Sequence, residues 1–434
     1  MPGIPSITMA TPKFLQLKCG TNNYEWGSTD PNSRVVRYAA ATPGFEKKDE
    51  PYSEMWMGTH ATLPSHDLAS GRPLADLLAE NPELMGAKVQ QAYESKLPFL
   101  FKIMSIGKIL PFQAHPDKEW GQKLHIKDPK QFVDPNHKPE IAIALSHFAG
   151  FSGFRPLKQI ISVLKAAPIF AEFPGAEATQ TFISTVSGNE ESEDKKIVQA
   201  NKAALRQFLH AILTQSTSRI EEYTKKLLDY IASPTSSFGP HGADLPGLLR
   251  LIHTQYGADP GLFSAPLLNC IFLKPGEYIY IGADEPHAYI TGEIVECMAS
   301  SDNVVNAGFC PPSDRNPDLL MDILTFEYLP KAAFKLDPKA KYGHSLLYDP
   351  PIDEFAILAT SLAPGQTENV DPIAGPSIMV FTKGKGRMSV GGQSKDVKEG
   401  EVYFVTYGEE VVLEAQDGDY EAGLEAYRCY TDLN

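Results

Sequence analysis

A change of hydrophobic period along the chain constrains its fold more than any other feature. In Ile197–Ile231, apolar residues recur three and four positions apart among Lys, Glu and Gln, as is typical of amphipathic helices. The regions on both sides contain short apolar runs bounded by turn residues, such as Phe14–Lys18 and Ile271–Ile281, which are typical of strands. The sequence therefore predicts a mainly β protein that carries a helical insertion.

Two similar turns indicate that the β part contains two related barrels. Pro275-Gly-Glu277 and Lys398-Glu-Gly-Glu401 are each followed by strand residues rich in aromatic side chains, a pattern typical of cupin, or jelly-roll, barrels. A chain of 434 residues also exceeds the size that one hydrophobic core usually fills. We predict a cupin-type β domain from residues 1–155 together with 263–335, a helical domain from 156–262, and a cupin-like C-terminal domain from 336–434.

Shorter patterns predict individual elements. Arg34–Tyr38 and Leu97–Met104 are predicted to form strands, and Pro73–Glu80 has the apolar spacing of a helix. Glycine-rich hairpins are predicted in Ile378–Gly392 and around Val397–Val405.

Composition excludes several classes of protein. No apolar run approaches the roughly 20 residues that a membrane span needs. The net charge of −15 disfavours nucleic acid and anionic membranes as partners, because binding them requires clustered Lys and Arg. Five widely spaced cysteines predict free thiols, and the N-terminus lacks the basic and apolar regions of a secretory signal. We therefore expect a cytoplasmic protein.

A split set of polar side chains predicts a metal site. Gln113 and His115 are two positions apart, so in an extended segment they point to the same side and can share one ion. His287 follows a proline at the end of a β-rich run, and either His137 or Glu140 can complete the set. Imidazole, carboxylate and amide ligands without cysteine favour one catalytic zinc with an open position, although cobalt and manganese also accept such ligands.

Several long motifs are spread along nearly the whole chain: Tyr24-Glu-Trp-Gly, Tyr52-Ser-Glu-Met-Trp-Met-Gly-Thr-His60, Gln113-Ala-His-Pro-Asp117, Asp134-Pro-Asn-His-Lys-Pro-Glu140, Gly153-Phe-Arg-Pro, His287-Ala-Tyr-Ile-Thr-Gly and Glu296-Cys-Met-Ala-Ser-Ser-Asp-Asn303. On these motifs the chain resembles the type I phosphomannose isomerases, the zinc-dependent mannose-6-phosphate isomerases, and most closely their eukaryotic, fungal-like branch. The resemblance covers nearly the whole chain. It implies that the first β domain is catalytic and that the zinc ligands are Gln113, His115, Glu140 and His287.

The resemblance also implies a reaction and residues that perform it. The family interconverts mannose 6-phosphate and fructose 6-phosphate by moving a proton between C1 and C2 through an enediol, a step that leads toward GDP-mannose. Glu296 matches a carboxylate of the family's site, and Lys138 is a second candidate for handling the proton or for stabilising charge. Asn306 stands at a catalytic position, while Asp302 and Trp26 are expected to bind substrate. The expected partner is a small sugar phosphate, and the expected state is a monomer.

Three positions depart from the family's pattern. Asn306 stands where the family has an arginine implicated in catalysis, and Pro312 where it has a lysine implicated in holding phosphate. Beside the metal ligands, Pro111 replaces a usual serine. Asparagine lacks the charge and the bidentate geometry of a guanidinium, so Arg315 is a candidate substitute.

These departures leave three hypotheses. The chain is an isomerase with reduced or rerouted catalysis, a zinc enzyme for a different, perhaps unphosphorylated, sugar, or a non-catalytic sugar-binding paralogue. An intact set of metal ligands argues against complete loss of catalysis.

Overall fold

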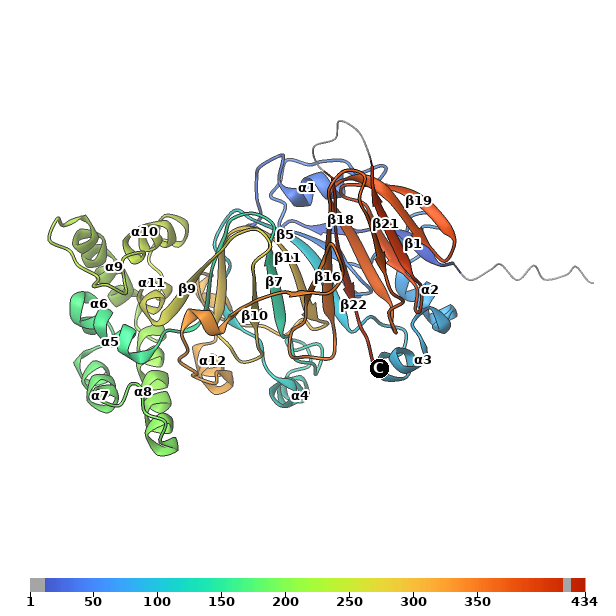
Figure 1. Cartoon of the computed structure of the whole chain (residues 1–434). Coiled ribbons are helices and arrows are strands. Elements are labelled where there is room, and N and C mark those ends of the chain that lie inside the picture. Colours follow the sequence, from blue (N-terminus) through green and yellow to red (C-terminus); the bar gives the residue numbers. More distant parts are fainter. Residues whose placement is uncertain (1–11, 417–422, 434) are drawn as a thin grey trace, which may run out of the picture. The chain divides into compact units, whose positions relative to one another are not determined.

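The computed structural model describes residues 12–416 and 423–433, which form two compact units (Figure 1). Unit 1 comprises the described residues up to Ser105, Val295–Ser300 and the described residues from Asp337 onward. Unit 2 comprises Ile106–Ile294 and Ser301–Leu336. The chain therefore crosses between the units several times, and the domain boundaries given above remain a prediction.

Unit 1 is built around one antiparallel sheet of 11 described strands, in the order β14-β15-β16-β22-β18-β20-β1-β4; β19 and β21 also pair with β18, and β17 pairs with β21. Strand β3 pairs with β2 and β5, and these three strands belong to the second sheet of 11 described strands. Its elements are β1 (Phe14–Lys18), β2 (Gly20–Asn22), α1 (Arg34–Ala39), β3 (Glu54–Met57), β4 (His66–Asp67), α2 (Leu74–Glu80), η1 (Pro82–Leu84), α3 (Ala87–Tyr93), β5 (Phe99–Ile106), β14 (Lys339–Ala340), β15 (Ser345–Tyr348), β16 (Ala356–Leu362), β17 (Thr367–Val370), β18 (Ser377–Val390), β19 (Gln393–Lys398), β20 (Val402–Val405), β21 (Val411–Ala415) and β22 (Leu424–Tyr430).

Unit 2 combines antiparallel strands with the helical insertion, whose helices gather in one place in Figure 1. Its elements are β6 (Phe112–Ala114), α4 (Lys118–Lys127), β7 (Glu140–Ala144), β8 (Phe148–Phe154), α5 (Leu157–Ala166), α6 (Ile169–Glu172), α7 (Ala176–Val186), α8 (Lys195–Leu213), α9 (Thr217–Ala232), α10 (Leu245–Tyr256), α11 (Gly261–Ser264), η2 (Ala265–Leu267), β9 (Leu268–Leu273), β10 (Tyr278–Ile281), β12 (Val305–Gly308), η3 (Pro312–Asp314), α12 (Pro317–Ile323), η4 (Lys331–Ala333) and β13 (Lys335–Leu336). Strand β11 (His287–Ala299) begins in unit 2 and ends in unit 1.

The strand predicted at Arg34–Tyr38 is wrong, because these residues form helix α1. Val35, Val36, Tyr38 and Ala39 are buried, and the offsets of one, three and four positions place them on one face of a helix. The Arg34 guanidinium also donates to the Tyr38 hydroxyl at 2.8 Å, a contact across one helical turn. One long strand, β18, runs through Gly384 and Gly386, and the hairpin turn lies at Gly391 and Gly392.

The helical insertion shares a continuous hydrophobic core with the strands of unit 2. Phe112 and Phe151 on the strands belong to the same buried cluster as Leu205 and Phe208 of α8. Because this core is close-packed, it holds β6 and β8 rigidly in place. A separate buried cluster in unit 1 includes Phe381 and Tyr403.

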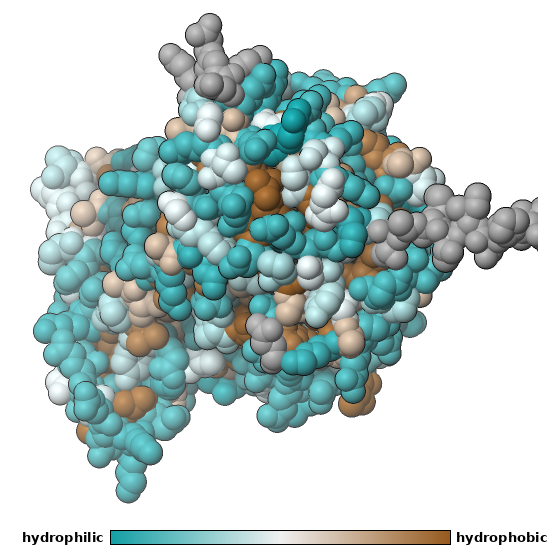
Figure 2. All heavy atoms as spheres, turned by 45° about the vertical axis from the view of Figure 1, so that its right-hand side comes forward, coloured by the Kyte–Doolittle hydropathy of each residue, from teal (hydrophilic) through white to brown (hydrophobic). Residues whose placement is uncertain are grey.

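The face of the molecule in Figure 2 is mainly hydrophilic, and its apolar side chains are scattered among polar ones. Among the described residues, no helix has the length and apolarity needed to cross a bilayer.

Candidate metal centre and its surroundings

A row of paired strands in unit 2 brings the predicted metal ligands to one face. On β6, Gln113 lies directly opposite His287 of β11 on one side and Asn306 of β12 on the other. Directly paired residues of antiparallel strands project from the same face of a sheet. His115 follows β6, and Glu140 is the first residue of β7. The local strands therefore position Gln113 beside His287, a pairing that the alternation of side chains along one strand does not predict.

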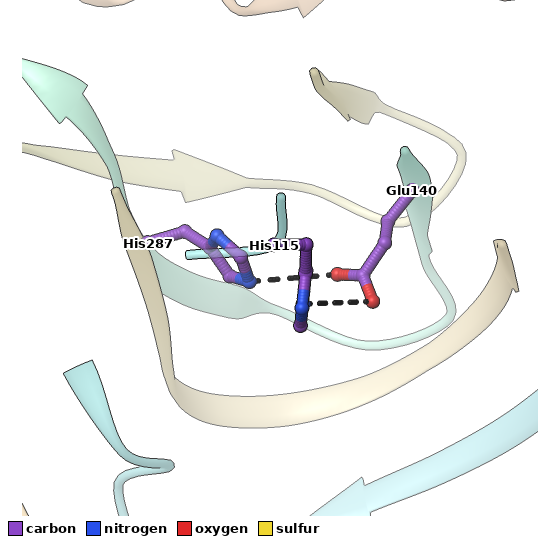
Figure 3. Close-up of side chains that lie close together, drawn as sticks. All are labelled: His115, Glu140 and His287. Carbon is purple, nitrogen blue, oxygen red and sulfur yellow. Dashed lines mark ion pairs between the residues drawn. The ribbon is translucent and has the colours of Figure 1, made fainter. Parts of the chain in front are cut away.

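Three of these side chains converge at a buried point. One ligand atom from each of His115, Glu140 and His287 lies within 4.8 Å of the others, and all three residues are buried (Figure 3). The Nε2 atom of His115 lies 3.3 Å from Glu140 Oε1, and Nε2 of His287 lies 3.5 Å from Oε2 of the same carboxylate. The group contains Glu140 and does not contain His137.

The hydrogen bonds of the two imidazoles make this arrangement unfavourable without a cation. Nδ1 of His115 lies 2.7 Å from the backbone oxygen of Asn303, and Nδ1 of His287 lies 3.1 Å from that of Glu285. Because a carbonyl oxygen only accepts, each Nδ1 carries the proton and each neutral ring presents a bare Nε2 lone pair. Both Nε2 atoms are buried without a hydrogen-bond partner, so three acceptors face one another. A divalent cation would satisfy all of them.

The electrostatics agree with neutral imidazoles beside an ionised carboxylate. Burial, followed by the nearby charge of Lys138, lowers the pKa of His115 to about 4. Burial is also the main cause that lowers the pKa of His287. For Glu140, burial alone would raise the pKa, but His115 and Lys138 together hold the pKa of this carboxyl well below its usual range. All three groups are thus in the protonation state that binds a metal at neutral pH.

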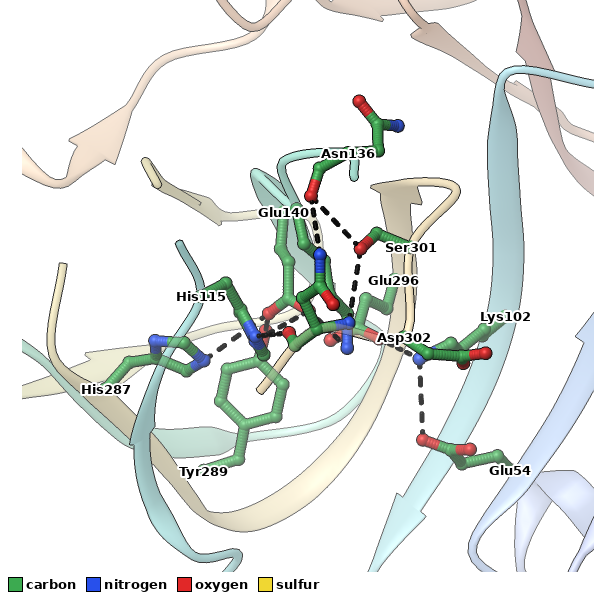
Figure 4. Close-up of polar contacts among 12 residues, drawn as sticks. Glu54, Lys102, His115, Asn136, Glu140, His287, Tyr289, Glu296, Ser301 and Asp302 are labelled. Atoms are coloured by element: carbon green, nitrogen blue, oxygen red, sulfur yellow. Dashed lines mark hydrogen bonds and ion pairs between the residues drawn. The ribbon is translucent and has the colours of Figure 1, made fainter. Parts of the chain in front are cut away.

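A polar network at the Nδ1 side of the ring orients the candidate metal ligand His115 (Figure 4). The Asp134 carboxylate accepts from the Ser301 hydroxyl at 2.8 Å and from the backbone N–H of Asp302 at 2.8 Å. The Asn303 amide donates to the backbone oxygens of Asp134 and Asn136, both at 2.9 Å. These bonds fix the Asn303 carbonyl that accepts from His115, and such outer contacts hold a ligand's tautomer and orientation.

The structure distributes the other predicted site residues as follows. Lys138 lies close to the candidate metal ligands, with Nζ 3.8 Å from Glu140 Oε1. The Asn306 amide oxygen is buried without a partner, beside Gln113 in the sheet. Asp302 is exposed next to the network of Asp134. In unit 1, Trp26 stacks on Tyr24 with ring centroids 5.8 Å apart.

Arg315, the candidate substitute for the family's arginine, is already engaged. Its guanidinium forms an ion pair with the buried Asp259 at 2.8 Å and donates to the backbone oxygen of Cys310. Asp259 also accepts from the backbone N–H groups of Gly261 and Phe309. These contacts give Arg315 a structural partner that it must leave before it can bind a phosphate.

A buried ionic cluster in unit 1 surrounds the predicted catalytic carboxylate. Nζ of Lys102 lies 2.9 Å from Glu296 Oε2 and 3.6 Å from Glu54 Oε1 (Figure 4). The Trp56 indole donates to Glu54 at 2.6 Å, and Lys102 lies over the Trp56 ring at 5.5 Å. The sequence reasoning missed Lys102, although a lysine inside the apolar run Leu97–Met104 was a signal that this charge is buried and paired.

Replacing Lys102 with methionine is expected to lower the free energy of unfolding by about 3–5 kcal/mol, because two buried carboxylates lose their shared cation. Urea denaturation measures the change. Lys96→Met, at an exposed position of the same unit, is the matched control and should change stability by less than about 0.5 kcal/mol. Equal effects of the two substitutions would contradict a stabilising role of the cluster.

Comparison with known proteins identifies the family. Residues 14–157 match the catalytic domain of type I phosphomannose isomerase, residues 174–268 its helical insertion domain, and residues 345–393 its C-terminal domain. The mannose-6-phosphate isomerase of Aspergillus fumigatus is 41% identical over 97% of this chain and 97% of its own length. The chain belongs to the type I phosphomannose isomerases. Within this family, the mannose-6-phosphate isomerase of Saccharomyces cerevisiae is 38% identical over 97% of this chain and 99% of its own.

Solved structures of family members share the fold. A zinc-bound mannose 6-phosphate isomerase matches with a TM-score of 0.78 and 26% identity, covering 97% of this chain and 100% of the other. The enzyme of Salmonella typhimurium bound to its substrate (f6p) and zinc matches with a TM-score of 0.77, 26% identity and the same coverage. The prediction of a mainly β, cupin-type fold with a helical insertion is therefore confirmed, as is the resemblance to type I phosphomannose isomerases.

Proposed function

We propose that this protein is a zinc-dependent isomerase that interconverts mannose 6-phosphate and fructose 6-phosphate. The observation that carries the proposal is the buried convergence of two neutral imidazoles and one carboxylate on a common point. Full-length relatives named mannose-6-phosphate isomerase support the same activity, and solved family members bind zinc. These relatives favour an isomerase over a non-catalytic paralogue or an enzyme for another sugar.

In this proposal, Gln113, His115, Glu140 and His287 hold one zinc ion. When bound, zinc supplies a Lewis acid that polarises an oxygen of the substrate and spreads the negative charge that develops in the transition state. Tyr289, whose hydroxyl lies 3.5 Å from Glu140 Oε2, and the Asn303 carbonyl keep two of these ligands oriented.

We assign the proton transfer between C1 and C2 to Glu296. A general base must lie where it can take a proton, and the buried carboxylate of Glu296 is held in place by an ion pair with Lys102 at 2.9 Å. Lys138 is assigned to stabilising charge on a substrate oxygen, because it reaches the edge of the metal group without replacing a ligand. Asp302 and Trp26 are assigned to binding the sugar phosphate. Asn306, which lies opposite Gln113 in the sheet, is assigned to polar contact with the substrate.

The proposal extends to the location, the oligomeric state and the pathway of the protein. The chain is inferred to act as a cytoplasmic monomer on a small sugar phosphate, in a step that supplies GDP-mannose synthesis. Its sequence lacks the clustered basic residues of a nucleic-acid or membrane-binding surface.

The activity is tested by supplying zinc-replete protein with mannose 6-phosphate and following fructose 6-phosphate with a coupled assay. Unphosphorylated mannose is supplied in parallel. Turnover of the phosphorylated sugar, well above that of mannose, is the expected result. Turnover of mannose alone would instead identify an enzyme for an unphosphorylated sugar.

Asn306→Arg is expected to raise kcat/KM for mannose 6-phosphate by about tenfold or more. A charged hydrogen bond contributes about 1.5–3 kcal/mol, and the Asn306 amide oxygen has no partner to lose in the described residues. Steady-state kinetics measure the ratio, with Gln131→Arg at an exposed position of unit 2 as the control for added charge. A fall in kcat/KM with the fold and the zinc content unchanged would mean that asparagine itself serves the reaction.

A further inference from the structure

A polar cavity lies in unit 2, where the helical insertion joins the strands. Its volume is about 270 Å³, and its walls come from the end of β8, from α5, from the start of α10, from β9 and from η4. The residues that matter for its chemistry are Arg155, Gln159, Asp244, Asn269, Cys270 and Lys331. None of them belongs to the metal centre or to the proposed catalytic residues.

Arg155 is buried at this cavity with an incomplete set of hydrogen bonds. Its Nε donates to the backbone oxygen of Leu268, and its Nη1 donates to that of His241. These two bonds connect the residue that follows β8 to the helical insertion and to the start of β9, a role that suits a long side chain with several donors. Nη2 is buried without a hydrogen-bond partner among the described residues, and the side chain is only 5% exposed. A guanidinium stays protonated in proteins, so this N–H group needs an acceptor.

The charges around the cavity favour an anion. Lys331 adds a second cation. Asp244, the one carboxylate among the described lining residues, forms an ion pair with Arg155 Nη2 at 3.8 Å, a distance too long for a hydrogen bond, so this N–H group keeps a free direction for another acceptor. Burial raises the pKa of the Cys270 thiol to about 12, and of the nearby charges Asp244 raises it whereas Arg155 and Lys331 lower it, so these charges act on one small region. The lining thus carries a net positive charge in a chain whose total is −15.

We propose that this cavity binds a small oxyanion, a phosphate group, between Nη2 of Arg155 and Nζ of Lys331. A planar guanidinium edge and an ammonium are the groups that proteins use for phosphate oxygens. A volume of about 270 Å³ admits a free phosphate or the phosphate end of a small metabolite. The bound anion would connect β8 and η4, and it would thereby stabilise the attachment of the helical insertion.

The test is anion binding by the zinc-loaded full-length protein and by three variants. Inorganic phosphate and glycerol 3-phosphate are titrated calorimetrically, and selenate is located by anomalous scattering in crystals. Lys331→Gln, at an exposed lysine, is expected to weaken binding at least fivefold. Asp244→Asn removes the competing carboxylate and is expected to tighten binding about fivefold. Lys225→Gln makes the same charge change as Lys331→Gln at an exposed position of α9 and should have no effect.

The direction of the Asp244→Asn effect separates the proposal from a purely structural role of Arg155, which predicts no gain in anion affinity. Tighter binding of glycerol 3-phosphate than of phosphate would identify a metabolite as the ligand, and the reverse would identify the free ion. An anomalous peak with unchanged affinities in all three variants would mean an adventitious ion only and would overturn the proposal. Absence of a peak beside Arg155 would do the same.

Discussion

Glu140→Gln is expected to lower zinc affinity by more than about 100-fold and to reduce isomerase activity to background. The Glu140 carboxylate lies within 3.5 Å of the Nε2 atoms of both His115 and His287, so it supplies the negative charge at the centre of the group. Glutamine keeps the shape of the side chain but offers one neutral oxygen, which is a much weaker ligand for a divalent cation. Zinc content by elemental analysis and turnover in the coupled assay measure the two effects.

Glu277→Gln is the matched control for this substitution. Glu277 lies in the same unit and pairs with Lys335 near the surface, away from the ligand set. We expect this variant to retain both zinc and activity. Glu140→Gln protein that keeps stoichiometric zinc at wild-type affinity would contradict the assignment of the metal centre, whatever its activity.

Glu296→Gln is expected to reduce kcat by about 10²–10⁴-fold while zinc binding stays normal, because a positioned general base contributes roughly that factor. The amide cannot accept the proton that leaves carbon. The variant still folds in this account, because Lys102 keeps Glu54 as a partner at 3.6 Å. Steady-state kinetics, zinc content and thermal unfolding together separate loss of chemistry from loss of structure.

Glu25→Gln, at an exposed carboxylate of the same unit, should leave kcat unchanged. A kcat for Glu296→Gln within a few-fold of wild type would exclude Glu296 as the base. A large fall in melting temperature or in zinc content would instead assign it a structural role in the cluster with Lys102.

Periodicity predicted the fold class because each pattern acts over neighbouring residues. The spacing in Ile197–Ile231 is satisfied locally by α8 and α9, and Phe14–Lys18 has the pattern of the strand that it forms. Local patterns do not predict which strands pair with each other. β1 pairs with β20, so Leu15 lies opposite Phe404 nearly the whole chain away, and no local pattern encodes that partner.

The restriction of these patterns to neighbouring residues also explains which site residues could be predicted. Gln113 and His115 were recognised as a pair because alternation along one strand is a local rule, whereas Glu140 and His287 were separated from them by long stretches of chain and needed the family motifs. The error at Arg34–Tyr38 arose because five residues satisfy two periods almost equally well. Lys102 was missed because its role follows from its ion pairs with Glu54 and Glu296, and the sequence does not show that these two carboxylates lie beside it.

The most direct test of the central claim is proton exchange at carbon in D₂O. Mannose 6-phosphate is incubated with zinc-loaded wild-type protein, and the sugar is analysed by NMR. We expect fructose 6-phosphate to form with deuterium incorporated at C1 and recovered mannose 6-phosphate to carry deuterium at C2, because the base exchanges its proton with solvent while the enediol exists. The absence of both product and deuterium, in protein with one zinc per chain, would contradict the account.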